Sequence, residues 1–228
     1  MSKQRLVSLA IIYGLINSSF CFAEVLFEDS FDGQLAEGWE IVGLSEDDYR
    51  IHDGGLEVRV APASEGSTTQ YLHVVMPEFK EYDFLRASVD ITLLDEFTQP
   101  EEFAAVILTD GGGWDFATRK QLIRRMLMYS PPKVEFHGEQ GHEDEFHKYS
   151  FTYWPVGEES GPLSIILRGQ NYAFAQIGPS TDNEYLNLFH SAVNKTPDVR
   201  GFGLQAGGGP AEGEHWVRFD NFRVVNGQ

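Results

Sequence analysis

Residues 215–225 read His-Trp-Val-Arg-Phe-Asp-Asn-Phe-Arg-Val-Val, and this stretch decides the fold. Its β-branched and aromatic residues favour a β-strand. Val217 and Phe219 share one side-chain parity, whereas Phe222 and Val224 share the other. Because successive side chains of a strand point to opposite faces, an unbroken strand would leave one of these pairs in water.

A β-bulge near Asp220 and Asn221 would bring both apolar pairs to the same side. A strand this apolar at the end of a chain needs a partner strand. The matching apolar stretch is residues 25–31, near the other end. The sequence therefore predicts that the two ends of the chain meet in one sheet.

The first residues have the order of a secretory signal peptide. Lys3 and Arg5 precede an apolar run, and the small residue Ala23 follows a short polar stretch. The run is far shorter than the roughly 20 residues that span a bilayer. We therefore expect cleavage of residues 1–23, leaving one domain over residues 24–228 that is secreted or periplasmic and is not bound to a membrane.

The chain is strongly acidic, with a net charge of −18. The predicted leader holds two of the 17 Lys and Arg residues and none of the 35 Asp and Glu residues, so the mature chain would carry about −20. Such a surface repels phosphate backbones and anionic membranes, which excludes nucleic acid binding as a main function. The single cysteine lies in the leader, so the mature chain cannot form an internal disulfide.

Short β-like segments fill the chain. Residues 56–60 and 85–93 alternate apolar with polar side chains, as half-buried strands do, and Glu57 falls on the polar side. Residues 103–109 form a continuous apolar run, which predicts a strand covered on both faces. Residues 110–113 then supply a glycine-rich turn.

Two hairpins are expected in the second half. The first has an outgoing strand over residues 134–137, an acidic tip at residues 138–145 and a return strand over residues 146–154. In the second, residues 163–167 and 172–177 surround a glycine-bearing turn.

Three segments carry other signals. Residues 118–129 fit a short helical turn followed by a strand, and residues 185–193 carry a weak helical pattern. Residues 199–206 favour a strand that is stopped by the glycines at 207–209. Many short strands separated by turns predict an all-β fold, a two-sheet antiparallel β-sandwich with at most short helical turns.

Three places resemble the concanavalin A-like jelly-roll superfamily, which includes laminin-G-like modules, laminarinase-type glycoside hydrolases and 3-keto-disaccharide hydrolase-like secreted domains. They are FEDSFDG at residues 27–33 with Trp39 following, HDGGLEV at residues 52–58, and FDNFRV at residues 219–224. The resemblance spans nearly the whole expected mature chain. It implies a jelly roll, but a fold does not fix a function.

The resemblance does not bring catalytic residues with it. Glycoside hydrolysis needs two carboxylates, which laminarinase-like relatives supply as Glu-x-Asp followed closely by Glu. Residues 46–48 and 81–83 read Glu-x-Asp, but neither triplet is followed by that second Glu. The predicted function is therefore carbohydrate binding or glycan association. A glycoside hydrolase or lyase acting on a polysaccharide or oxidised disaccharide, and a structural or protein-interaction sandwich, are the alternatives.

A recognition face is expected on the polar side of the first hairpin. Alternation along its strands places Glu135 and His137 on one side together with Trp154. With Arg124 and Trp114, these residues could stack on a sugar ring and hydrogen-bond its hydroxyls. Packing of both tryptophans in the core or in loops is the alternative.

Two further clusters of side chains, one basic and one of histidines, each allow two interpretations. Five basic residues lie within residues 119–133, where they either serve a ligand or neutralise neighbouring carboxylates. His137, His142 and His147 recur every five residues, which allows either a transition-metal site or a pH-sensitive surface pair.

The resemblance also implies a Ca²⁺ site where the two chain ends meet. The ligands carried over lie near Asp29, the carbonyl of Gly54, and Asp220. Ca²⁺ takes about six to eight oxygens and mixes carboxylates with carbonyls. Ser30 stands where many relatives carry a second acid, which lowers the expected charge of the site. Alternatively, Asp220 accepts hydrogen bonds from backbone amides at the bulge.

Overall fold

The computed structural model describes residues 23–62, 70–76, 82, 84–100, 102–109, 123–130, 133–142, 145–151, 160–168, 172–177, 186–192 and 201–227. Side chains are described for residues 23–62, 70–76, 82, 84–100, 102–108, 163–165 and 201–227. Within the described residues every regular element is a β-strand. The same residues contain no helix with the length and hydropathy to cross a membrane.

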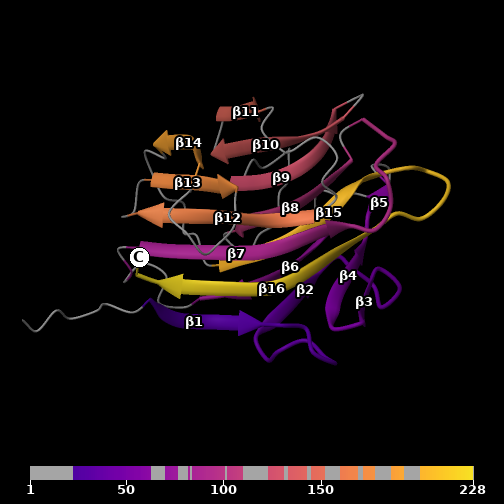
Figure 1. Ribbon diagram of the computed structural model, residues 1–228, viewed down its shortest axis with the longest axis horizontal. Coiled ribbons are helices and arrows are strands. Elements are labelled where there is room, and N and C mark those ends of the chain that lie inside the picture. Colours follow the sequence, from indigo (N-terminus) through magenta and orange to yellow (C-terminus); the bar gives the residue numbers. More distant parts are fainter. Residues whose placement is uncertain are drawn as a thin grey trace, which may run out of the picture.

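The strands form two sheets of eight strands each, which pack face to face (Figure 1). The first sheet has the spatial order β14 (Leu186–Ala192), β13 (Tyr172–Ile177), β12 (Ser160–Arg168), β7 (Phe84–Leu93), β16 (Trp216–Asn226), β4 (Gly55–Arg59) and β3 (Tyr49–His52), and β1 (Glu24–Asp29) pairs with β16.

The second sheet has the order β11 (Glu145–Phe151), β10 (Lys133–His142), β9 (Ile123–Ser130), β8 (Phe103–Thr109), β15 (Gly201–Gly209), β6 (Tyr71–Val75) and β2 (Trp39–Val42), and β5 (Ala61–Pro62) pairs with β15. The described pairings are antiparallel apart from the parallel contact of β5 with β15. The predicted all-β sandwich is confirmed.

The main core lies between the two sheets. Leu56 of β4 and Phe219 of β16 meet Leu72 of β6 and Phe202 of β15 there, and all four side chains are fully buried. Strand β7 alternates buried with half-buried positions along its whole length, and the described side chains of β8 are all buried, as the hydrophobic patterns predict.

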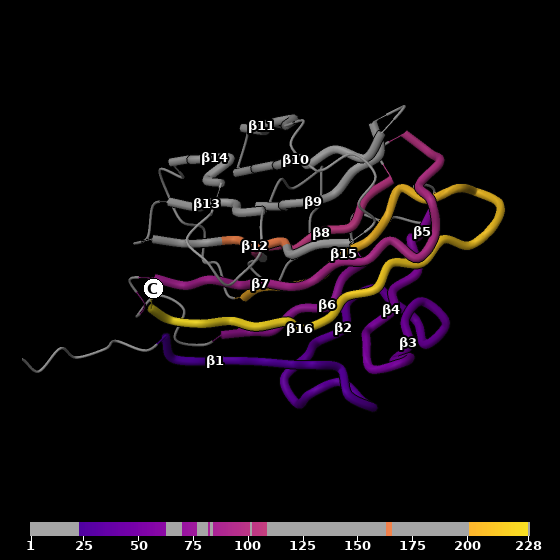
Figure 2. Tube along the Cα trace, in the orientation of Figure 1, coloured from indigo at the N-terminus to yellow at the C-terminus, as the bar shows by residue number. Residues whose placement is uncertain are grey.

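The two ends of the chain meet as predicted. Strand β1 pairs antiparallel with the second half of β16, and Figure 2 shows the two side by side. The predicted bulge is also present, because the register of β16 shifts between Asp220 and Arg223 and Asn221 has a φ of 53°. The bulge brings both Phe219 and Phe222 into the core.

Two expectations about single segments are corrected. Residues 185–193 carry a weak helical pattern, but β14 is a strand paired with β13. Backbone hydrogen bonds to a neighbouring strand outweigh a weak helix preference. The glycines at 207–209 do not stop β15, which runs through them, because Gly207 pairs with β8 on one side and with β5 on the other.

Both hairpins occur where the turn signals predict them. The second joins β12 to β13, with Arg168 opposite Tyr172. In the first, pairing of β10 with β11 continues as far as His142 opposite Glu145, so the strands enter the region expected to be a tip. The predicted strand of residues 118–129 is β9, whereas the helical turn before it and the glycine turn at residues 110–113 lie outside the described residues.

Candidate functional site

A tight hairpin in the first sheet positions a group of charged side chains. Strands β3 and β4 are joined by Asp53 and Gly54, with His52 opposite Gly55. The φ angles of Asp53 and Gly54 are 49° and 74°, the left-handed pair that a two-residue type I′ turn requires. The turn fixes the register of the hairpin. Arg50 and His52 therefore project from the outer face, whereas Tyr49 and Ile51 pack against the core.

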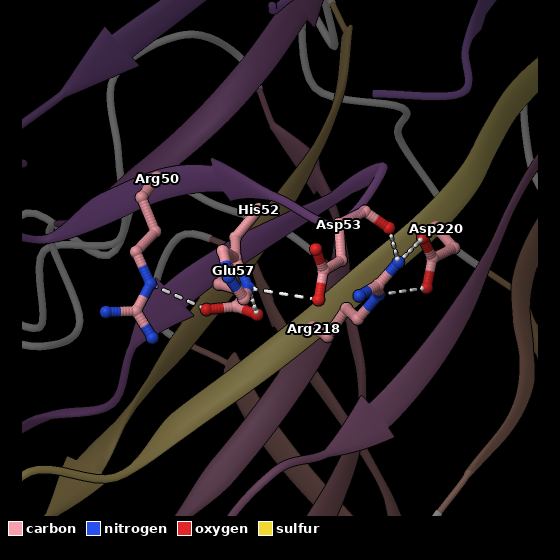
Figure 3. Close-up of polar contacts among 6 residues, drawn as sticks. All are labelled: Arg50, His52, Asp53, Glu57, Arg218 and Asp220. Carbon is pink, nitrogen blue, oxygen red and sulfur yellow. Dashed lines mark hydrogen bonds and ion pairs between the residues drawn. The ribbon is translucent and has the colours of Figure 1, made fainter. Parts of the chain in front are cut away.

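Glu57 is the centre of this group. It lies opposite Arg50 of β3 and opposite Arg218 of β16. Its Oε2 accepts a hydrogen bond from Arg50 Nε at 2.6 Å, and its Oε1 lies 3.1 Å from His52 Nδ1 (Figure 3). The sequence placed Glu57 on the polar side of a half-buried strand, but its side chain is only 4% exposed because its partners cover it.

Arg50 and His52 are held by Glu57 yet face water. The Arg50 guanidinium lies 4.1 Å from the centroid of the Trp216 ring, a cation–π contact that helps to hold the side chain in place. Its terminal nitrogens form no hydrogen bond to the described residues, and the side chains of Arg50 and His52 are 53% and 58% exposed. We call Arg50, His52, Glu57 and Trp216 the outer platform.

Arg218 lies on the other side of Glu57 and binds the hairpin turn. Its Nε donates to Asp220 Oδ2 at 2.8 Å, and a terminal nitrogen donates to the carbonyl of Asp53 at 2.7 Å and to Asp220 Oδ1 at 3.3 Å (Figure 3). The hydrogen bond to Asp220 raises the pKa of Arg218 above its ordinary value, although burial acts in the opposite direction. The negative charges of Glu57 and Asp53 raise it further.

Asp29, the first predicted calcium ligand, is bound by three protein donors. Its Oδ1 accepts from the backbone N–H of Phe31 at 2.7 Å. Its Oδ2 accepts from the backbone N–H of Ala36 and from Trp39 Nε1, both at 2.8 Å. The carboxylate is buried and closes the loop that follows β1.

The other two predicted ligands lie at the β3–β4 turn. Both oxygens of Asp220 contact the Arg218 side chain, so the expected hydrogen bonds from backbone amides are replaced by a guanidinium. Gly54 sits in the turn whose Asp53 carbonyl Arg218 also binds. In the part of the chain that the structure describes, no group of three or more His, Cys, Asp or Glu residues is placed to hold a metal ion. As arranged, these residues do not fit Ca²⁺, and calcium binding itself stays a prediction.

Three of the residues predicted to recognise a sugar, Arg124, Glu135 and His137, lie on strands of the second sheet. Arg124 of β9 is opposite Glu139 of β10, and Glu135, His137 and Glu139 alternate along β10. These positions therefore share one face. Their role in binding stays a prediction. Two further members of the predicted set lie outside the described residues: Trp114 and Trp154.

The same face carries a buried histidine that sequence reasoning did not single out. Cross-strand pairs connect Arg124 to Ile107, Gly203 and His73 in one row across four strands. The His73 ring is buried, with Nε2 2.9 Å from Glu40, and Nδ1 has no hydrogen-bond partner among the described residues. Only a structure reveals this row, because its members come from distant segments.

The three histidines of the first hairpin do not share a face. His137 is opposite Ser150, whereas His147 is opposite Gln140, two residues before His142. His137 therefore occupies the face of opposite parity from His142 and His147. His137 and His147, the two positions that flank the hairpin tip, therefore lie on opposite faces of the sheet.

The sequence held a partial signal for the outer platform. Arg50 and His52 are two residues apart, directly before the Asp-Gly turn that sets Glu57 across from them. This spacing places both side chains on one face of a hairpin. The contribution of Trp216 depends on the pairing of β16 with β4, which brings distant residues together.

The chain matches no family model and no curated protein by sequence. Among solved structures it is similar to the GH43 protein BlXynB from Bacillus licheniformis, with a TM-score of 0.66 at 11% identity over 88% of this chain and 39% of that one. It is also similar to the CBM2 module of the evolved Dit protein of Lactobacillus casei BL23 phage J-1, with a TM-score of 0.58 at 10% identity over 90% and 97% of the two chains.

A third similar structure is the GlcNAcα1-4Gal-releasing endo-β-galactosidase from Clostridium perfringens, with a TM-score of 0.57 at 12% identity over 89% of this chain and 62% of that one. The chain spans about two fifths of the length of the GH43 protein. At these identities the likeness shows the fold, a β-sandwich that also occurs in carbohydrate-active proteins.

Proposed function

We propose that the chain is an exported, glycan-binding β-sandwich domain of the concanavalin A-like kind, and that it recognises its glycan without cleaving it. The sequence resemblance supports the superfamily, and the order of residues 1–23 supports export. The similar structures support the ligand class, since one is a GH43 protein and another is an endo-β-galactosidase.

The outer platform is the observation that carries the proposal. A sugar presents neighbouring hydroxyls on its edge and C–H groups on its face, so planar polar side chains beside an aromatic ring complement it. Arg50 is stacked over the Trp216 ring, and its terminal N–H groups bind none of the described residues; His52 offers a ring nitrogen. Because Glu57 and Trp216 already hold Arg50 in place, little side-chain entropy is lost on binding.

The buried carboxylates support recognition rather than hydrolysis. In the described part of the chain they are Asp29, Asp48, Glu57 and Glu102, and each is held by hydrogen bonds within the protein. Glu102, for example, accepts from the backbone N–H groups of Thr98 and Gln99. A glycosidase needs a carboxylic acid that can give up its proton and a second carboxylate free to act on the sugar.

The test combines a binding assay with an activity assay. Purified chain is applied to a glycan array and to insoluble polysaccharides, and reducing sugar is measured in the same samples. We expect the wild type to bind without releasing sugar. Arg50→Ala should bind roughly tenfold more weakly, because it loses one or two charge-assisted hydrogen bonds to the glycan. Arg223→Ala is the matched control, because in the described part of the chain the side chain of that exposed arginine makes only a 3.9 Å contact with Glu28.

Each result decides one point. Absence of binding to every glycan would refute the proposed function, and sugar release above the buffer blank would establish the hydrolase alternative. Equal effects of Arg50→Ala and Arg223→Ala would reject the outer platform as the site. Arg124→Ala and His137→Ala in the same assay then test the predicted face on the second sheet.

A further inference from the structure

Left-handed backbone conformations occur where the two chain ends meet. In the described residues three non-glycine residues have a left-handed backbone: Phe31, Asp53 and Asn221, with φ angles of 60°, 49° and 53°. They lie in the loop after β1, in the β3–β4 turn and at the bulge of β16. Asp and Asn adopt this conformation readily, as Asp53 does in the type I′ turn, whereas Phe31 keeps it only where the surrounding structure enforces it. We call the loop after β1, the β3–β4 turn and the bulge of β16 the seam.

Arg218 connects two of these segments. It donates to the carbonyl of Asp53 in the turn and to both oxygens of Asp220 beside the bulge. The side chains of Arg218 and Asp220 are 22% and 24% exposed, so water competes only weakly for these bonds. One cation thus neutralises Asp220 and fixes the turn.

Gly55 provides the space that the guanidinium occupies. A Cβ on this residue would lie 2.7 Å from Arg218 Cζ and 2.7 Å from Asp220 Oδ1, and closer still to Arg218 Nε. Gly55 does not have a left-handed φ, so the need for glycine here is one of space. Residue 55 and Arg218 therefore form a matched pair.

The oxygens that Arg218 binds are of the kind that Ca²⁺ selects. Two carboxylate oxygens and one carbonyl converge on the guanidinium, and mixed carboxylate and carbonyl sets are typical of calcium sites. A guanidinium offers five N–H donors in a rigid fork to the same acceptors. We infer that Arg218 is the built-in cation of the seam, taking the place that the resemblance assigns to Ca²⁺, and that this chain folds and binds independently of calcium.

The inference extends to ligand binding. The turn that Arg218 holds is the turn of the hairpin that carries Arg50 and His52. Arg218 is accordingly a positioning residue for the outer platform, and this consequence rests on the proposed function. The role of Arg218 in the stability of the fold is independent of that function.

Thermal melts in EDTA and in millimolar Ca²⁺ test the inference directly. We expect equal melting temperatures for the wild type in the two buffers, and a loss of several degrees for Arg218→Met in both. Gly55→Ala should lower the melting temperature similarly, because its methyl group displaces the guanidinium. For the double variant Arg218 is truncated to Ala, which removes Nε and Cζ, and both single variants are measured beside it. Gly55→Ala with Arg218→Ala should lose clearly less than the two single losses combined, since the vacated space accepts the methyl group. Arg218→Lys, which keeps the charge without the fork, should fall between wild type and Arg218→Met.

Three results would overturn the inference: stabilisation of the wild type by Ca²⁺, a wild-type melting temperature for Arg218→Met, or full additivity in the double variant. Glycan binding is measured alongside in both buffers. In EDTA it should persist for the wild type and weaken for Arg218→Met. If the wild type binds no glycan in either buffer, the proposed function fails, while the melts still decide the role of Arg218.

Discussion

Asp48 shows how a single buried carboxylate of this protein is kept ionised. Its Oδ2 accepts from the backbone N–H of Ser45 at 2.8 Å and from the Ser45 hydroxyl at 2.6 Å, and its Oδ1 accepts from Arg59 Nε at 2.8 Å. Burial acts to raise the pKa of Asp48, but the hydrogen bonds from Ser45 and Arg59 outweigh it and lower the pKa below its ordinary value. The charged form of Asp48 therefore stabilises the folded chain.

Replacing Asp48 with Asn should lower the free energy of unfolding by about 2 kcal/mol at neutral pH, the scale of hydrogen bonds to a charged group. Because the folded-state pKa is lowered, this contribution is complete above the unfolded pKa of about 3.9 and is lost as the pH falls through the folded pKa. Urea unfolding at several pH values measures it. The difference between wild type and Asp48→Asn should shrink as the pH drops below about 4, and a constant difference would contradict the assignment.

Strand β15 shows how a requirement for glycine arises at the scale of an element. A Cβ on Gly201 would collide with the carbonyl oxygen of Val74, and one on Gly203 with that of Leu72. Neither glycine has a left-handed φ, so the cause is the close approach of β15 to β6. Sequence reasoning treats glycines in a strand as a weakness, whereas here they permit the pairing.

Gly203→Ala should therefore destabilise the protein by about 2 kcal/mol or more, because the backbone of β15 or of its paired strand β6 must shift to make room for the methyl group. Gly213→Ala is a useful comparison, since that glycine has open space around it but a φ of 92°. Left-handed strain alone should cost about 1–2 kcal/mol there. Denaturant unfolding of both variants gives the ranking. A smaller loss for Gly203→Ala than for Gly213→Ala would show that β15 can move away from β6.

Elements whose signals are local were predictable from the sequence. The change of parity between Phe219 and Phe222 indicated the bulge, and Asp53-Gly54 is the dipeptide of the β3–β4 turn. The errors lie where a neighbouring strand decides, as in β14, whose weak helical pattern yields to pairing with β13. The outer platform was missed for a related reason, because Trp216 reaches Arg50 only through the pairing of β16 with β4.

At the scale of the whole molecule, both ends of the described chain belong to one sheet. Strand β16 lies between β7 on one side and β4 and β1 on the other, so the last strand is an interior strand. The core residues Phe219, Phe222 and Val224 come from it. Folding of the sandwich therefore depends on contacts between segments far apart in sequence, which slows folding relative to local hairpins.

This arrangement bears on where the predicted leader would be removed. Strand β1 begins at Glu24, opposite Asn226, so cleavage after Ala23 would leave the whole β1–β16 pairing in the exported protein. We expect the intact mass of exported protein to match residues 24–228. A chain expressed without its leader should melt at the same temperature, because the described partners of β1 lie within that range. A mass that retains Cys21 would show that cleavage occurs elsewhere, and one that also carries lipid would show that the chain is anchored to a membrane.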